Sequence, residues 1–87
     1  MREFGGHGCG IEFHEDPFVS FVELAGTGPI LVPGMCFTIE PMVNMGAADI
    51  DMSDPNGWTV RTADGLPSAQ WEVQVAVTES GFELISW

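Results

Sequence analysis

Residues 69–78 read AQWEVQVAVT and carry the longest β-strand pattern in this chain of 87 residues. Apolar side chains from Trp71 to Val77 recur at every second position, whereas Glu72 and Gln74 occupy positions between them. Because successive side chains of a strand point to opposite faces, this alternation predicts one apolar face and one polar face. No stretch keeps an apolar period of 3.6 residues, so we predict a mostly antiparallel β structure with little helix.

The segments on either side extend the β pattern. Residues 35–40 (MCFTIE) alternate in the same way, with Glu40 on the face that points away from Phe37. Residues 47–57 are rich in Asp, Pro, Asn and Gly and predict an irregular loop. Further strands are predicted at residues 18–22, 58–62 and 81–85.

The charge balance excludes two classes of partner. Two basic and thirteen acidic side chains give a formal net charge of −11. Nucleic acid backbones and anionic membrane surfaces repel such a chain, so we expect neither as a partner. Hydrophobic residues nevertheless make up 45% of the sequence, which is typical of a folded domain and not of a disordered acidic tail.

The cysteine content and the hydropathy pattern favour a cytoplasmic location. Cys9 and Cys36 are too few for the disulfide framework of a small secreted domain, and we expect thiols. No apolar run approaches the ~18 residues of a membrane helix. The first residues also lack the charged-then-apolar pattern of a signal sequence.

Four side chains are candidates for chemistry. His7 and His14 lie in or beside a glycine-rich stretch, and Glu40 and Glu72 lie within strand patterns. A carboxylate in the core of a sheet is costly unless it is paired or bound to a metal. A plainer interpretation stays open for each, because a strand Glu often faces solvent and a lone His is often hydrogen-bonded scaffold.

Four segments together carry a family resemblance. In their order and spacing they closely resemble the C-terminal half of the type I methionine aminopeptidases, which are pita-bread metallopeptidases. The resemblance implies an α+β pita-bread fold of which residues 1–87 form a single partial domain, the C-terminal half. The segments are residues 6–17 (GHGCGIEFHEDP), 33–43 (PGMCFTIEPMV), 57–60 (GWTV) and 68–72 (SAQWE).

The resemblance also implies roles for particular residues. His14, Glu40 and Glu72 match metal ligands of the family, and Glu40 is also placed to take a proton from the attacking water. Trp58 matches an aromatic residue near the pocket for the methionine side chain. His7 matches a position that is not a ligand. The complete family site holds two divalent ions, and these ligand types suit Co, Mn, Fe or Zn.

The implied activity is hydrolytic removal of N-terminal methionine from peptides and nascent proteins. Two ligand aspartates of the family lie in its N-terminal half, so we expect the isolated chain to hold at most one ion weakly and to be inactive or nearly so. Phe21 and Val73 stand where the family often has histidine. The expected partner is an N-terminal half or a second copy of the chain. The alternative is a non-catalytic binding or dimerisation module derived from the same fold.

Overall fold

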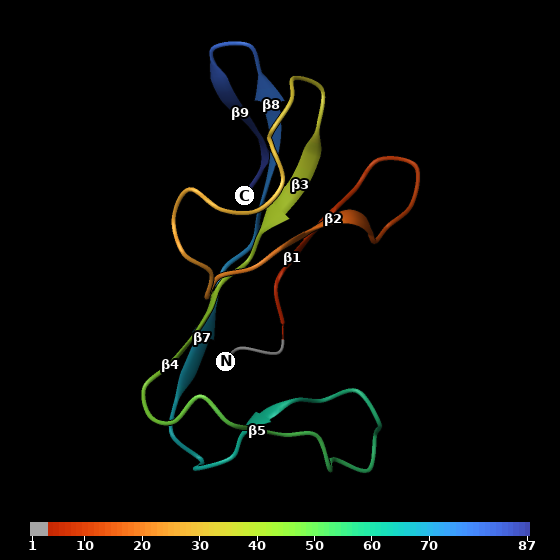
Figure 1. The fold of residues 1–87 in the computed structure, drawn as a ribbon. Coiled ribbons are helices and arrows are strands. Elements are labelled where there is room, and N and C mark those ends of the chain that lie inside the picture. The colour runs from red at the N-terminus through yellow and green to blue at the C-terminus, as the bar shows by residue number, and fades with distance from the viewer. Residues whose placement is uncertain (1–3) are drawn as a thin grey trace.

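The computed structural model describes residues 4–87, which form nine β-strands and no helix (Figure 1). Five strands build one sheet in the order β2-β1-β3-β8-β9, and each neighbouring pair is antiparallel. The prediction of mostly antiparallel β structure is therefore confirmed. These strands are β1 (Gly6–Gly8), β2 (Glu15–Val19), β3 (Cys36–Ile39), β8 (Val73–Thr78) and β9 (Gly81–Ser86).

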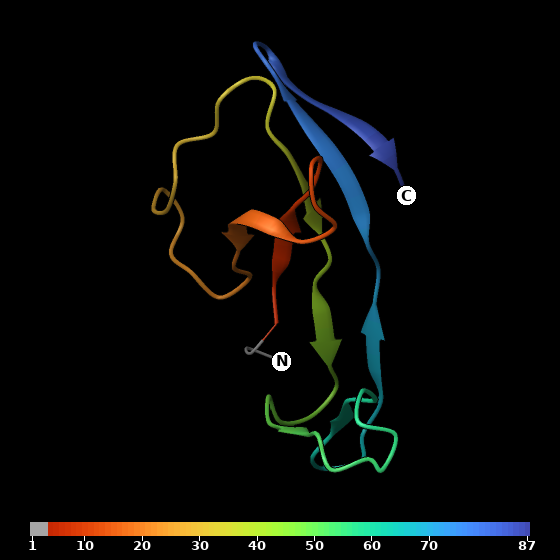
Figure 2. The same cartoon turned by 90° about the vertical axis from the view of Figure 1, so that its right-hand side faces the viewer.

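Two further ladders continue the fold beyond this sheet. β4 (Met42–Asn44) pairs with β7 (Ser68–Gln70), and β5 (Ile50–Asp51) pairs with β6 (Arg61–Thr62). Figure 2 shows the segments β3–β4 and β7–β8 running side by side along the length of the molecule. The molecule is accordingly elongated, with extents of 43 × 28 × 20 Å.

The single strand predicted for residues 69–78 is divided in two by a short interruption. β7 ends at Gln70 and β8 begins at Val73, and the facing segment is likewise interrupted between β3 and β4. Pro41 lies in that facing interruption and has no N–H to donate to a ladder. The pairing on either side keeps one register, since Ile39 lies opposite Val73 and Met42 lies opposite Gln70.

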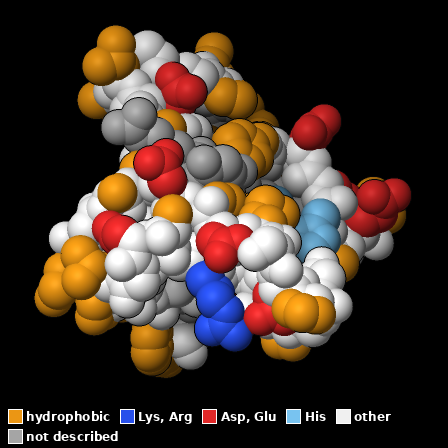
Figure 3. All heavy atoms as spheres, turned by 90° about the horizontal axis from the view of Figure 1, so that it is seen from below, with side chains coloured by type: hydrophobic (Ala, Val, Ile, Leu, Met, Phe, Trp, Pro, Cys, Tyr) orange, Lys and Arg blue, Asp and Glu red, His pale blue; other side chains and the backbone are white. Residues whose placement is uncertain are grey.

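The core of the sheet is small. Phe37 and Val75 lie opposite each other on the apolar face and are only 7% and 2% exposed, as the alternation predicts. Many other large hydrophobic side chains, including Trp58 and Trp71, remain exposed. Figure 3 shows several groups of hydrophobic side chains at the surface of one end of the molecule. Within residues 4–87 no helix has the length and hydrophobicity needed to cross a bilayer.

The glycine-rich segment forms a strand, β1, that the sequence pattern did not predict. A Cβ atom at Gly6 would collide with the carbonyl oxygen of Thr38, and one at Gly8 would collide with that of Asp16. Glycine therefore lets neighbouring backbones approach β1 on both sides. This approach brings the side chain of His7 close to β3.

Two predicted strand boundaries are wrong. The strand predicted at residues 18–22 is β2, which begins at Glu15 and ends at Val19. The strand predicted at residues 58–62 is reduced to β6, because the side chain of Asn56 accepts hydrogen bonds from the N–H groups of Trp58 and Thr59 and holds them in a turn. The predicted loop at 47–57 also contains the two residues of β5.

Candidate metal centre

Glu40 and Glu72 lie opposite each other at the interruption between the two ladders. Glu40 directly follows β3 and Glu72 directly precedes β8, and the register shared by both ladders pairs these two positions. Like charges directly opposite each other on a sheet destabilise it by roughly 0.2–1 kcal/mol. A bound cation would offset this repulsion, so the pair fits a metal site better than a purely structural role.

The imidazole of His7 lies beside the two carboxylates and forms a group of three candidate ligands with them. Ligand atoms of His7, Glu40 and Glu72 all lie within 4.8 Å of one another. His7 Nε2 is 3.2 Å from Glu40 Oε1, and both side chains are only 17% exposed. Two ligands held about 2.0–2.2 Å from one ion are themselves roughly 3.0–3.5 Å apart in tetrahedral or octahedral geometry. The donor set and its spacing therefore fit a divalent metal ion.

The ring of His7 is fixed by its backbone neighbour. Its Nδ1 lies 3.0 Å from the carbonyl oxygen of Gly8, and because a carbonyl only accepts, Nδ1 carries the proton. The ring thus forms an ion pair with Glu40 when it is protonated, and it offers the lone pair of Nε2 when it is neutral. Metal-binding histidines commonly donate their other ring N–H to a carbonyl in this way.

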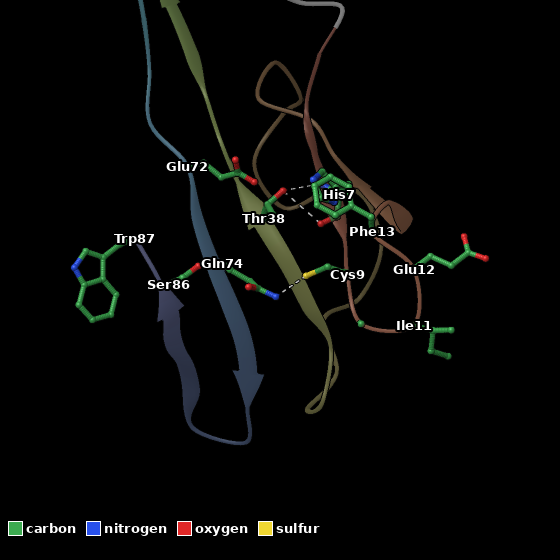
Figure 4. A pocket seen from close by; sticks show the side chains of 11 residues that line it. His7, Cys9, Ile11, Glu12, Phe13, Thr38, Glu72, Gln74, Ser86 and Trp87 are labelled. Carbon is green, nitrogen blue, oxygen red and sulfur yellow. Dashed lines mark hydrogen bonds between the residues drawn. The ribbon is translucent and has the colours of Figure 1, made fainter.

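The hydroxyl group of Thr38 connects His7 to Glu40. Its hydroxyl oxygen accepts the backbone N–H of His7 at 2.9 Å, and the hydroxyl donates to Glu40 Oε1 at 2.9 Å. Thr38 is 5% exposed, so water does not compete for these bonds. Figure 4 shows the hydroxyl of Thr38 beside the ring of His7, with Glu72 entering from the neighbouring strand.

His7, Thr38 and Glu72 line a cavity of about 660 Å³. This volume lies within the range of ordinary small-ligand sites, roughly 300–1,000 Å³. Gln74 of β8 lines the same cavity as Glu72, and the aromatic ring of Phe13 lies on the side of His7 (Figure 4). A small ligand in this cavity would therefore meet both polar groups and an aromatic ring.

His14, the predicted histidine ligand, lies next to the group but outside the set defined by the 4.8 Å separation. Its side chain is exposed, and its ring stands edge-on to that of His7 with 4.3 Å between the centroids. Within residues 4–87 the ring of His14 makes aromatic contacts with His7 and Phe13 and no hydrogen bond. The role of His14 stays a prediction.

The position of His7 was not predicted from the sequence. The sequence feature that indicates this position is the pair of glycines that flank His7. Gly6 and Gly8 allow another strand to approach His7, whereas larger residues would keep the backbones apart. Trp58 lies on the segment between β5 and β6, is 78% exposed and does not line the 660 Å³ cavity. Its proposed contact with substrate also stays a prediction.

Comparison with known proteins shows the family to which the chain belongs. Residues 1–79 match the profile of metallopeptidase family M24, and the chain belongs to this family. It is 49% identical over 86 residues to the methionine aminopeptidase of Chlamydia pneumoniae, covering 99% of this chain and 29% of that protein. It is 48% identical over 87 residues to the methionine aminopeptidase of Escherichia coli K12, covering 99% of this chain and 32% of that protein.

A solved structure agrees with these relationships. The methionine aminopeptidase from Rickettsia prowazekii superposes with a TM-score of 0.91 at 46% identity, covering 95% of this chain and 34% of that one. The likeness confirms the fold class that the sequence predicted. The chain spans about a third of the length of these relatives.

Proposed function

We propose that this chain is the metal-carrying, C-terminal segment of a type I methionine aminopeptidase, which hydrolyses the N-terminal methionine from peptides and nascent proteins. The observation that carries the proposal is the opposed pair of Glu40 and Glu72 with an imidazole beside it. The names of its relatives support the same activity. We further propose a cytoplasmic location, in which nascent chains are available.

The proposed ligands are His14, Glu40 and Glu72, with Co, Mn, Fe or Zn in divalent form. A bound divalent metal supplies Lewis acidity toward the peptide carbonyl and toward water. His14 matches the ligand histidine of the family motif, and its ring nitrogens have no hydrogen-bond partner within residues 4–87. His7 is the alternative ligand, because its Nε2 already faces Glu40.

Glu40 is also the proposed catalytic base. The hydrogen bond from Thr38 and the contact with His7 hold one carboxylate oxygen, Oε1, in a fixed place. A carboxylate held within hydrogen-bond reach of a water can take its proton and pass that proton to the leaving amine. Trp58 is the proposed contact of the methionine side chain, since its exposed indole is free to pack on an apolar group.

A chimera tests this proposal. In the E. coli relative, the segment that matches this chain is replaced by residues 1–87, so that the relative supplies the other two thirds of the fold. Release of methionine from a Met-peptide by the folded chimera, and its loss in the same chimera with Glu72→Gln, support the proposal. A folded chimera that binds metal and releases no methionine contradicts it.

The second candidate function is a non-catalytic binding or dimerisation module. The small core and the many exposed hydrophobic side chains favour a partner, either an N-terminal half or a second copy of the chain. Such a module has no use for a metal. Mn²⁺ titration heats that are equally small for the natural chain, for His14→Ala and for Glu72→Gln would support it.

A further inference from the structure

Cys9 directly follows β1 and lies opposite Cys36, the first residue of β3. Gly8 pairs with Phe37 in the antiparallel ladder between β1 and β3, and one hydrogen bond joins the next two positions, from the N–H of Cys9 to the carbonyl of Cys36 at 3.1 Å. Cα atoms of residues directly opposite each other in an antiparallel ladder are about 4.5–5.5 Å apart. This separation falls within the range of about 4.4–6.8 Å that a disulfide spans.

The two side chains also share a face of the sheet. Residues directly opposite in an antiparallel ladder project to the same side. The thiol of Cys9 accepts a hydrogen bond from Gln74 Nε2 at 2.9 Å, and Gln74 lies on β8, beyond β3. The sulfur of Cys9 is therefore directed over β3, the strand that carries Cys36, as the dashed line in Figure 4 indicates.

A small reagent can reach both thiols. Both cysteines are free and only half-buried, and both line a cavity of about 310 Å³. Thiol exchange requires access of the attacking sulfur to the disulfide that it attacks. Neither cysteine belongs to the candidate metal ligands.

We propose that Cys9 and Cys36 form a reversible dithiol–disulfide pair, oxidised by a low-molecular-weight disulfide such as oxidised glutathione. The thiolate of one cysteine attacks a glutathione sulfur, which forms a mixed disulfide and releases one reduced glutathione. The second cysteine gives up its proton and attacks the protein sulfur of that mixed disulfide, which releases the second reduced glutathione. The protein loses two electrons and two protons, and the oxidant takes them up.

The bond would join β1 to β3 beneath the metal centre. β1 carries His7, and β3 carries Thr38 and leads into Glu40, so the disulfide would fix the two elements that position the Glu40 carboxylate. It would also close the loop formed by residues 9–36, which lowers the entropy of the unfolded chain. We expect the Tm to rise by roughly 10 °C on oxidation.

The test is equilibration of the full chain in glutathione redox buffers, with and without urea, followed by acid quenching and mass mapping. We expect the peptide linked through Cys9 and Cys36, with an equilibrium constant for its formation roughly tenfold or more higher without urea. The double variant Cys36→Ser, Met35→Cys is the matched control. This variant keeps two thiols at almost the same separation along the chain but moves the second thiol to the opposite face of the sheet.

The control should end as mixed disulfides with glutathione. Three results would each overturn the proposal. They are glutathione adducts in place of the disulfide on the natural chain, equal equilibrium constants for disulfide formation with and without urea, and equally efficient disulfide formation in the control. The readout uses neither metal nor peptidase activity, so its outcome is independent of the proposed function.

Discussion

Glu40 lies directly opposite Glu72 where the long antiparallel ladder of β3–β4 and β7–β8 is interrupted. The two carboxylates differ in their partners. Glu40 accepts a hydrogen bond from Thr38 and lies 3.2 Å from His7, whereas Glu72 is exposed. In the absence of a metal, the carboxylate of Glu40 is therefore stabilised by Thr38 and His7, whereas the carboxylate of Glu72 contributes only repulsion toward Glu40.

This asymmetry predicts opposite effects on stability. In the presence of a chelator, Glu72→Gln should raise the free energy of unfolding by roughly 0.2–1 kcal/mol, because it removes a facing like charge. Glu40→Gln should lower the free energy of unfolding by roughly 1–3 kcal/mol, because it weakens hydrogen bonds made to a charged group. Urea unfolding measures both. Glu79→Gln, at the exposed turn before β9, is the control and should change little. Changes of the same sign in both variants would contradict the assignment.

Substitution of His14 and of His7 should weaken metal binding to different extents. We expect His14→Ala to weaken Mn²⁺ binding by roughly 10–100-fold or more, because His14 is a proposed ligand. His7→Ala should weaken it less, since His7 then acts through the position of Glu40. Isothermal titration measures both variants under one buffer. The reverse order would assign the ligand role to His7.

Thr38 should matter through its hydroxyl group. Thr38→Val keeps the shape of the side chain but leaves the backbone N–H of His7 without its acceptor and Glu40 without its donor. We expect a loss of roughly 1–3 kcal/mol in the free energy of unfolding. Thr38→Ser keeps the hydroxyl and should lose less. Equal losses in thermal or urea unfolding would show that packing, and not the hydrogen bonds, determines the effect.

Asp64 should titrate below the usual range of an aspartate. Hydrogen bonds from the N–H of Ala47, at 2.7 Å, and of Leu66, at 3.1 Å, lower its pKa from the ordinary value of 3.8. A lowered pKa stabilises the folded loop above the ordinary value, and this contribution is lost as the pH falls through the folded-state pKa. The amide resonance of Ala47 should follow this titration. In Asp64→Asn the acid-dependent shift should disappear, and its persistence would contradict the assignment.

Much of the site follows from strand alternation. Once residues 35–40 and 69–78 are taken as antiparallel neighbours, Glu40 and Glu72 fall on the polar face and Phe37 and Val75 on the apolar face. The interruption at Glu72 could not be predicted from alternation, because the pattern of apolar residues continues through it. The interruption depends instead on the facing segment, where Pro41 cannot donate a hydrogen bond.

The approach of His7 could not be predicted from the sequence pattern either. Glycine disfavours strands in general, and a segment with Gly6 and Gly8 therefore gives no strand signal. Its extended backbone is set by tertiary contact, since carbonyl oxygens of Thr38 and Asp16 occupy the space where Cβ atoms would lie. This close approach of the backbones places His7 beside Glu40.

The most direct test of the metal centre is a Mn²⁺ titration of the chain, followed by the loss of the free-ion electron paramagnetic resonance signal. A chain with a net charge of −11 attracts cations everywhere on its surface, so the comparison must remove one acid at a time. We predict that the natural chain and Glu79→Gln each bind one ion with equal affinity, and that Glu72→Gln binds it at least roughly tenfold more weakly. Equal binding by all three proteins would contradict a metal centre at Glu40 and Glu72.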